Sequence, residues 1–220
     1  EGIIASSACL GGVYAGCYWE NREKGPEAVL DAMRDTTRRM QSIFGDRWYG
    51  ELQWNNIPEQ HELNKYIIQV CKEMGVEMIS TADSHYPNPD AWRDRELYKR
   101  LGWLGKGRPS WGGDGELPID VDEIGYELYP KNGDQMWESY KKYSKQCGVE
   151  YDDQLVYDSL TTTHFIAHER IESFMPDNTV RLPDFVIPVG ETADSALRKF
   201  CFEGLRAKNL HNDDEYTDRL

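Results

Sequence analysis

Asp83 and His85 are the pair of residues in this sequence best suited to chemistry, and they lie in the run TADSHY, from Thr81 to Tyr86. Alternate residues of an extended segment point the same way, so one loop can present a carboxylate and an imidazole side by side. Both groups are common ligands of divalent metal ions. Spacing alone leaves an alternative open, in which Asp83 hydrogen-bonds its own backbone in a turn and His85 is an ordinary loop residue.

Cys9 and Glu51 are two further candidate ligands. Cys9 lies in the small-residue turn ACLGG. A thiolate there suits a metal such as zinc, although a lone cysteine in such a turn is more often a packed thiol. Glu51 lies inside an expected strand, where its side chain faces the interior or the solvent with similar ease. Together with Asp83 and His85, these residues would supply donors for a divalent ion such as Zn, Mn or Mg.

His164 and His168 are four residues apart on an expected helix, a spacing that can hold a metal ion. No glutamate follows His164, as the metalloprotease signature requires, and the neighbouring Glu169 and Arg170 indicate a solvated face. We therefore interpret this pair as surface residues.

The elements that must position the candidate ligands follow the order strand, helix, strand, helix, strand. Apolar runs predict strands, and helical spacing with a glycine at the end predicts the helices between them. Pro26 also suits the first turn of the earlier helix. The strands are expected at residues 2–6, 48–53 and 76–80, and the helices at 26–44 and 59–74. This order predicts an α/β fold with right-handed βαβ units in a parallel sheet or barrel. Functional groups of parallel α/β barrels cluster beyond the carboxyl ends of the strands, where Cys9 and Asp83 are expected.

The sequence changes character after Tyr86. Helices are expected at 90–101, 134–147 and 152–174, with a long Gly- and Trp-rich loop at 102–116. A proline-punctuated connector follows at 176–190, and Thr192 with Ser195 begins a last helix. We expect a domain boundary near the connector.

Charge and cysteine content exclude some classes of function. The chain has 220 residues with 25 basic and 39 acidic side chains, a net charge of −14. A phosphate backbone is repelled by such a surface, so this segment is not expected to be the main contact with nucleic acid. Five scattered cysteines without a C-x-x-C pair argue against disulfides and indicate a reducing, cytoplasmic setting. No apolar run approaches the ~18 residues of a membrane span.

Four blocks in chain order resemble the alpha subunit of bacterial DNA polymerase III, a family C polymerase. Residues 1–12, EGIIASSACLGG, resemble its apolar strand followed by Ser-Gly-Cys-Leu. YGELQ at 49–53 looks like its Glu-Leu-Gln strand, and ISTADSHY at 79–86 matches its Thr-Asn-Asp-x-His-Tyr element with Ala82 in place of the asparagine. The junction into the polymerase core looks like LPDF at 182–185, Pro188, GETAD at 190–194 and EGL at 203–205.

The resemblance implies a fold and a set of ligands. It implies the C-terminal part of a distorted (βα)7 PHP barrel over residues 1–175, then a connector and the beginning of the polymerase core at 176–220. Ligand roles map onto Cys9, Asp83 and His85, whereas Glu51 has no secure counterpart. The His-x-His opening, further ligands and the magnesium-binding carboxylates of the polymerase are not among these residues. We therefore expect an internal piece of a longer protein, without catalytic residues for polymerisation and inactive by itself.

The resemblance also implies a function. The parent protein is expected to be a DNA-directed DNA polymerase that uses DNA and dNTPs, with a proofreading exonuclease subunit and a sliding clamp as partners. Its PHP domain is expected to bind divalent metals and to hydrolyse phosphodiesters as a 3′–5′ exonuclease. Two alternatives stay open: a metal-free PHP scaffold that stabilises the polymerase and docks partners, and a free-standing PHP phosphoesterase.

Overall fold

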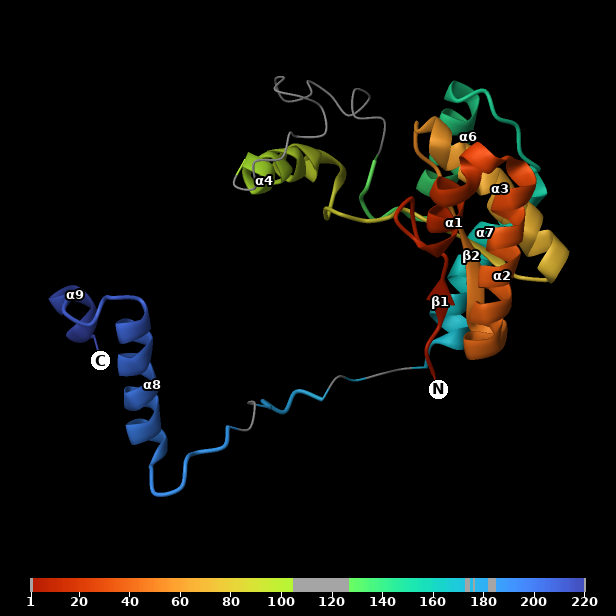
Figure 1. Cartoon of the computed structure of the whole chain (residues 1–220). Coiled ribbons are helices and arrows are strands. Elements are labelled where there is room, and N and C mark those ends of the chain that lie inside the picture. The colour runs from red at the N-terminus through yellow and green to blue at the C-terminus, as the bar shows by residue number, and fades with distance from the viewer. Residues whose placement is uncertain (1, 105–126, 173–174, 176, 182–184, 220) are drawn as a thin grey trace. The chain divides into compact units, whose positions relative to one another are not determined.

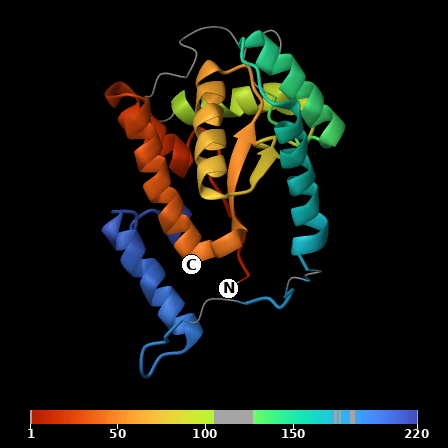
Figure 2. The same cartoon turned by 90° about the vertical axis from the view of Figure 1, so that its right-hand side faces the viewer.

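The computed structural model divides the chain into two compact units, Glu1–Glu172 and Ser173–Leu220 (Figures 1 and 2). The structure describes residues 2–104, 127–172, 175, 177–181 and 185–219. Most of the loop predicted at 102–116 lies outside the described residues, from residue 105 onward. The assignment of residues 1–175 to a PHP domain and of 176–220 to a connector and polymerase start stays a prediction.

Three parallel strands form the sheet of the first unit. They are β1 (Ala5–Ser6), β2 (Trp48–Gln53) and β3 (Met78–Thr81), in the spatial order β1-β2-β3. All six residues of β2 are buried between the other two strands. The predicted parallel α/β arrangement is thus confirmed. The strand expected at residues 2–6 is shorter than predicted, because only Ala5 and Ser6 pair with β2.

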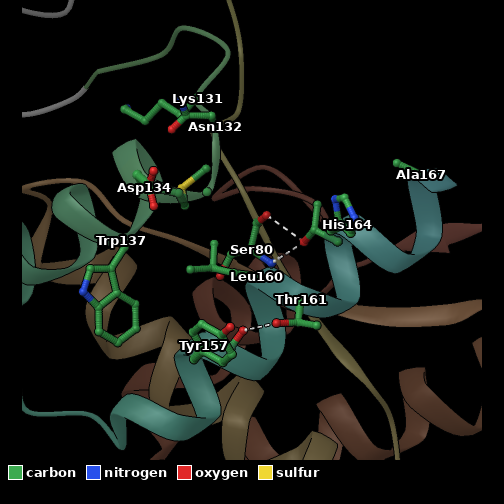
Figure 3. Close-up of a pocket in the computed structure, with 13 residues that line it drawn as sticks. Ser80, Lys131, Asn132, Asp134, Trp137, Tyr157, Leu160, Thr161, His164 and Ala167 are labelled. Atoms are coloured by element: carbon green, nitrogen blue, oxygen red, sulfur yellow. Dashed lines mark hydrogen bonds between the residues drawn. The ribbon is translucent and has the colours of Figure 1, made fainter.

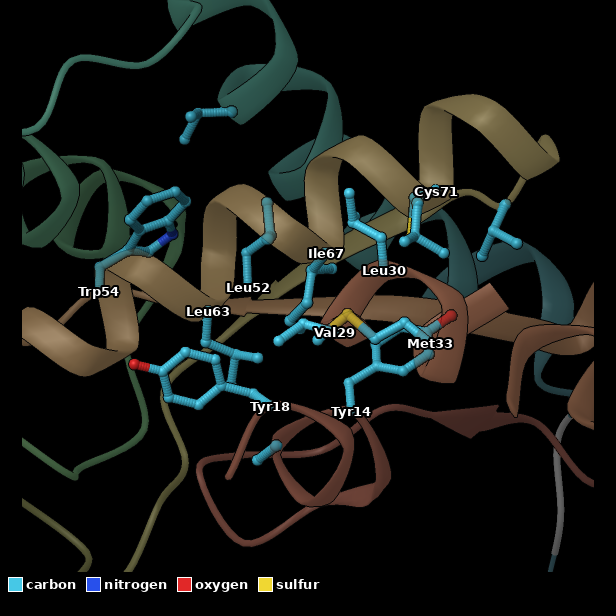
Figure 4. Close-up of a cluster of buried hydrophobic side chains, with 14 of the residues drawn as sticks. Tyr14, Tyr18, Val29, Leu30, Met33, Leu52, Trp54, Leu63, Ile67 and Cys71 are labelled. Atoms are coloured by element: carbon cyan, nitrogen blue, oxygen red, sulfur yellow. The ribbon is translucent and has the colours of Figure 1, made fainter. Parts of the chain in front are cut away.

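Helices α2 (Pro26–Phe44) and α3 (Pro58–Met74) connect the strands, as predicted from their helical spacing and the glycine after each. Helix α3 begins one residue before its predicted start. Alternation along β2 places Trp48 and Leu52 on one face of the sheet. On this face they join one apolar core with α2 and α3, whose contributions include Val29, Met33, Leu63 and Ile67 (Figure 4).

Gly50 allows α3 to lie close against β2. A Cβ atom at this position would lie 2.4 Å from Cys71 Sγ and 3.1 Å from Ile67 Cγ2, both on α3. Any other residue would force the side chains of Cys71 and Ile67 to shift, because a close-packed interior does not absorb an added methyl group.

Helix α1 (Val13–Asn21) was not predicted. Its residues are VYAGCYWEN, and it buries Tyr14, Ala15 and Tyr18. Because it has a glycine at its centre and only a weak apolar stripe, its residues show no clear helical period. The Tyr14 hydroxyl lies 2.6 Å from Thr37 Oγ1 of α2 and accepts a hydrogen bond from Trp48 Nε1 at 3.2 Å.

The remaining elements are short turns and helices. In the first unit they are η1 (Arg22–Lys24), η2 (Gly45–Arg47), η3 (Pro89–Ala91), α4 (Trp92–Leu104), α6 (Gly133–Gln146), α7 (Asp153–Phe165) and η4 (Ile166–Arg170). The second unit contains α8 (Ala193–Ala207) and α9 (Asp214–Thr217). Thr192 and Ser195 form a reciprocal cap at the start of α8, where the sequence predicts the helix to begin. No helix within the described part of the chain is long and apolar enough to cross a bilayer.

The helix predicted at 152–174 is interrupted. α7 ends at Phe165 and continues as one π-helical turn, η4, to Arg170. Arg170 donates to the Tyr49 hydroxyl at 2.6 Å and pairs with Asp46 at 2.6 Å, which ties this turn to the start of β2. The Arg170 guanidinium holds the pKa of the Asp46 carboxyl below its usual value.

Helix α7 supplies hydrogen-bond partners for backbone groups on the outer edge of β3. Gly50 N donates to Glu77 O at 3.0 Å, so by strand alternation the N–H and C=O of Ser80 point away from β2. The Thr163 hydroxyl accepts from Ser80 N at 3.1 Å and lies 3.0 Å from Ser80 O and 2.9 Å from Ser159 O, to which its proton can be donated. One helical side chain therefore occupies the place of a further strand at this residue.

Thr163→Val is expected to lower the free energy of unfolding by about 1–3 kcal/mol, because it leaves the edge N–H and C=O of Ser80 without partners. Urea unfolding of the purified protein measures this loss. Thr163→Ser, which keeps the hydroxyl, is the matched control and should lose less. An unchanged stability in Thr163→Val, which keeps a methyl group but lacks the hydroxyl, would contradict this role of the hydroxyl.

His61 on α3 is buried between two polar partners. Its Nε2 lies 2.9 Å from Asn55 O, to which it donates, and its Nδ1 lies 2.8 Å from the Tyr151 hydroxyl. Burial lowers the pKa of His61 below its ordinary value of 6.5. The neutral imidazole is therefore the form that the folded protein holds.

Because the unfolded chain binds a proton on His61 more readily than the folded chain, stability should fall as the pH is lowered below about 6.5. His61→Gln is expected to remove this part of the pH dependence, measured by urea unfolding between about pH 5 and about pH 7.5. His211, exposed on the second unit, provides the matched control, since His211→Gln should keep the wild-type dependence. A dependence unchanged in His61→Gln contradicts this role of His61.

Candidate metal centre

Asp83 and His85 lie together just beyond the end of β3, as the sequence predicts. His85 Nε2 is 3.5 Å from Asp83 Oδ1, and the two side chains are 47% and 30% exposed, respectively. A carboxylate and an imidazole thus share one partly open position at the carboxyl end of the sheet. Such a pair can supply two ligands of a divalent ion.

The backbone at Asp83 adopts the left-handed conformation, with a φ of 48°. Aspartate tolerates this region better than most residues, yet it still costs energy. The conformation ends the extended path of β3 and turns the chain into the Asp83–His85 loop. A strained residue of this kind persists only where its surroundings hold it, and such residues cluster at functional sites.

Tyr86 and Leu128 hold the far end of this loop. His85 N and Tyr86 N both donate to Leu128 O, at 2.7 and 3.2 Å, and Leu128 N donates to the Tyr86 hydroxyl at 2.7 Å. Tyr86, Leu128 and Trp92 are buried together in a small apolar cluster. The backbone of His85 is therefore fixed from a segment distant in the sequence.

Glu51 lies in the middle of β2 and is buried. Its Oε2 accepts a hydrogen bond from Ser6 Oγ at 2.5 Å. Its Oε1 accepts from Thr81 Oγ1 at 2.5 Å and from Gln53 Nε2 at 2.9 Å. The carboxylate is thus engaged by protein donors from all three strands.

Cys9 lies in the turn after β1 and is half-buried. Its carbonyl accepts from Gly12 N at 2.8 Å, which closes the turn. Gly12 has no room for a side chain, because a Cβ atom would lie 2.0 Å from Ser7 O. Ala8, immediately before Cys9, has a φ of 58° and is left-handed like Asp83.

Within the described residues, no three or more His, Cys, Asp and Glu side chains gather closely enough to hold a metal ion. Asp83 and His85 meet, whereas Cys9 and Glu51 do not complete such a group with them. The donor chemistry of the pair fits a divalent ion, but a protein zinc site uses three or four protein ligands. The full ligand set of Cys9, Asp83 and His85, with Glu51 as a further candidate, therefore stays a prediction.

Two other features carry no comparable chemistry. The rings of His164 and His168 have centroids 4.1 Å apart, and no third ligand joins them among the described residues. A hollow of about 800 Å³ lies beside His164, between α6, α7 and Ser80 (Figure 3). Its walls include Trp137, Tyr157 and Leu160, and they are more apolar than polar.

Sequence reasoning missed the contacts that hold the candidate ligands. These are the hydroxyls of Ser6 and Thr81 on Glu51 and the clamp between Tyr86 and Leu128. Thr81 and Tyr86 flank the Asp83–His85 pair within the same motif, and this proximity is the only signal of their role in the sequence. The partner Leu128 has no signal of this kind.

The fold and this pair define an α/β protein with a candidate divalent-metal centre at the carboxyl end of a parallel sheet. Over its whole length the chain is 29% identical to DNA polymerase III subunit alpha of Aquifex aeolicus and 24% identical to that of Thermus aquaticus. It is 25% identical to the Borreliella burgdorferi subunit over 96% of the chain. These comparisons confirm the resemblance indicated by the sequence blocks. The chain spans only 18%, 16% and 16% of the three relatives. No protein-family model matches it.

Ala8→Gly is expected to raise the free energy of unfolding by about 1 kcal/mol, because glycine adopts a φ of 58° without the Cβ penalty. Ala5→Gly, three residues earlier in β1, is the matched control. It should lower stability by about 0.5–1 kcal/mol, since glycine weakens a strand. Urea unfolding compares the two, and a loss of stability in both variants would contradict a strained Ala8.

Proposed function

We propose that this chain is part of a replicative DNA polymerase of the III alpha type. The similarity of the whole chain to these subunits carries the proposal. The parent protein would extend DNA from dNTPs in the cytoplasm, with its polymerase carboxylates outside the present residues. A proofreading exonuclease subunit and a sliding clamp are the partners that the resemblance implies.

Residues 1–175 are proposed to form a PHP domain whose barrel includes β1, β2 and β3. Support comes from the parallel strand order and from the helices that connect consecutive strands. The polar row Tyr49, Glu51 and Gln53 on β2 would face the barrel interior, since the opposite face packs on α2 and α3. In barrels of this type side chains of one strand alternate between interior and helices.

The PHP domain is proposed to bind divalent metal and to hydrolyse phosphodiesters. Asp83 and His85 would hold an ion, with Cys9 as a further ligand. A metal ion bound there supplies a water of lowered pKa as the nucleophile. The chain itself contributes the carboxylate of Asp83 and the imidazole of His85, both held in place by the ends of their loop.

A metal-free scaffold is the second candidate function. The observation in its favour is that only two of the predicted ligands meet among the described residues. Such a scaffold would stabilise the polymerase and dock its partners. The two functions differ in metal content and in hydrolysis, so one set of measurements separates them.

In the full-length protein that contains this chain, Asp83→Ala should lower single-strand degradation by roughly 100-fold or more, because the site loses a ligand and part of its neutralising charge. Primer extension should be retained at least in part. Metal content is measured by elemental analysis, and degradation is measured with added manganese or zinc. A wild type without metal and without hydrolysis would contradict the proposal and leave the scaffold.

Asp90→Ala is the matched control for this experiment. Asp90 is exposed, lies seven positions along the chain and carries the same side chain. It should keep wild-type metal content and wild-type degradation. A loss in Asp90→Ala equal to that in Asp83→Ala would show that general charge, and not the Asp83 position, sets the activity.

A further inference from the structure

Glu51 presents a buried carboxylate with neutral partners. It is 8% exposed, and the side-chain donors to it among the described residues are the hydroxyls of Ser6 and Thr81 and the amide of Gln53. No ion pair within the described residues includes Glu51. Burying a carboxylate is costly unless hydrogen bonds replace its water, so this arrangement is maintained by the donors around it.

These donors connect the ends of three strands. Ser6 is the last residue of β1, Thr81 is the last residue of β3, and Glu51 lies between them on β2. Strand pairing places Ser6 opposite Tyr49 and Thr81 opposite Gln53, on the same face of the sheet as Glu51. A single carboxylate therefore bridges both outer strands where they leave the sheet.

The two bridged residues begin the two candidate ligand loops. Thr81 precedes Asp83 by two positions, and Ser6 precedes Cys9 by three. Each loop then passes at once through a left-handed residue, Ala8 or Asp83. The direction in which each loop leaves the sheet thus depends on the strand end that Glu51 holds.

We propose that Glu51 is a positioning residue for the candidate metal centre and not one of its ligands. This inference rests on the proposed metal-binding function. Three of the roughly four lone-pair positions of its carboxylate are already used by protein donors. By holding Ser6 and Thr81 it sets the starting points of the Cys9 and Asp83–His85 loops. Residues that orient metal ligands in this way commonly change metal affinity about 10–100-fold.

The test uses the full-length protein with Glu51→Gln, Thr81→Val, Thr81→Ser and the double variant Glu51→Gln/Thr81→Val. Affinity for Mn²⁺ and the absorption spectrum of bound Co²⁺ are measured for each. Glu51→Gln and Thr81→Val should each weaken binding about tenfold. Thr81→Ser, which keeps the hydroxyl, should restore affinity and spectrum. The double variant should weaken binding by less than the product of the two single effects, since Thr81 acts through its hydrogen bond to Glu51.

Thr37→Val is the matched control. Thr37 is a buried threonine on α2 whose hydroxyl bonds to Tyr14 and to Met33 O at 2.7 Å. It should lower stability without changing Mn²⁺ affinity or the Co²⁺ spectrum. If Thr81→Val binds like wild type while Glu51→Gln loses the metal, Glu51 is itself a ligand and the inference is overturned.

A second readout separates this inference from the proposed function. Amide hydrogen exchange of residues 82–86 reports whether the loop is held, with or without metal. Glu51→Gln and Thr81→Val should raise this exchange about tenfold, whereas Thr37→Val should not. A wild type that binds neither Mn²⁺ nor Co²⁺ ends the metal-binding proposal. Unchanged exchange in both variants ends the positioning role, whatever the metal result.

Discussion

The burial of β2 on both faces is the constraint on which the rest of the first unit depends. Trp48 and Leu52 point into the apolar core, whereas Glu51 and Gln53 point the other way and are buried as well. The first face requires helices against it, and Gly50 lets α3 come close enough. The second face requires hydrogen-bond donors for a carboxylate. Both requirements are met by the neighbouring strands and helices, which places the ends of β1 and β3 on either side of β2.

Sequence reasoning succeeded where a local pattern carries the information. Helices α2 and α3 have an apolar stripe and a glycine at the end, and α2 also has a proline at the start; these signals are independent of the rest of the fold. The pairing of Asp83 with His85 follows from their spacing in one loop. The four-block resemblance also depends only on residue order and was confirmed by the comparisons.

The sequence could not predict what depends on distant partners or on a broken period. Leu128 meets Tyr86 across 42 positions, and nothing in either segment encodes the pairing. The hydrogen bond from Ser6 to Glu51 spans 45 positions. Residue spacing within β2 therefore could not show whether the Glu51 side chain faces the interior or the solvent. Helix α1 has a central glycine that interrupts its apolar period, so the sequence did not predict it. The π-helical turn at Ile166–Arg170 has the same composition as a continuing α-helix, so its change of geometry could not be predicted.

The two candidate loops store strain at the same edge of the sheet. Ala8 and Asp83 both have positive φ values, and each lies within two residues of a strand end. The segment that resembles Ser-Gly-Cys-Leu has alanine in place of the glycine, so this chain accepts a penalty at Ala8 that a glycine would avoid. At Asp83 the side chain matters more than the backbone preference, since glycine would remove the carboxylate that meets His85. These strained conformations persist because hydrogen bonds hold both strand ends. Glu51 binds the ends of β1 and β3, and Thr163 binds the outer edge of β3. The rigidity of the sheet and the strained conformation of the loops therefore depend on each other. Because the end of β3 is held, the chain can turn sharply at Asp83, and this turn brings the Asp83 carboxylate within 3.5 Å of the His85 imidazole.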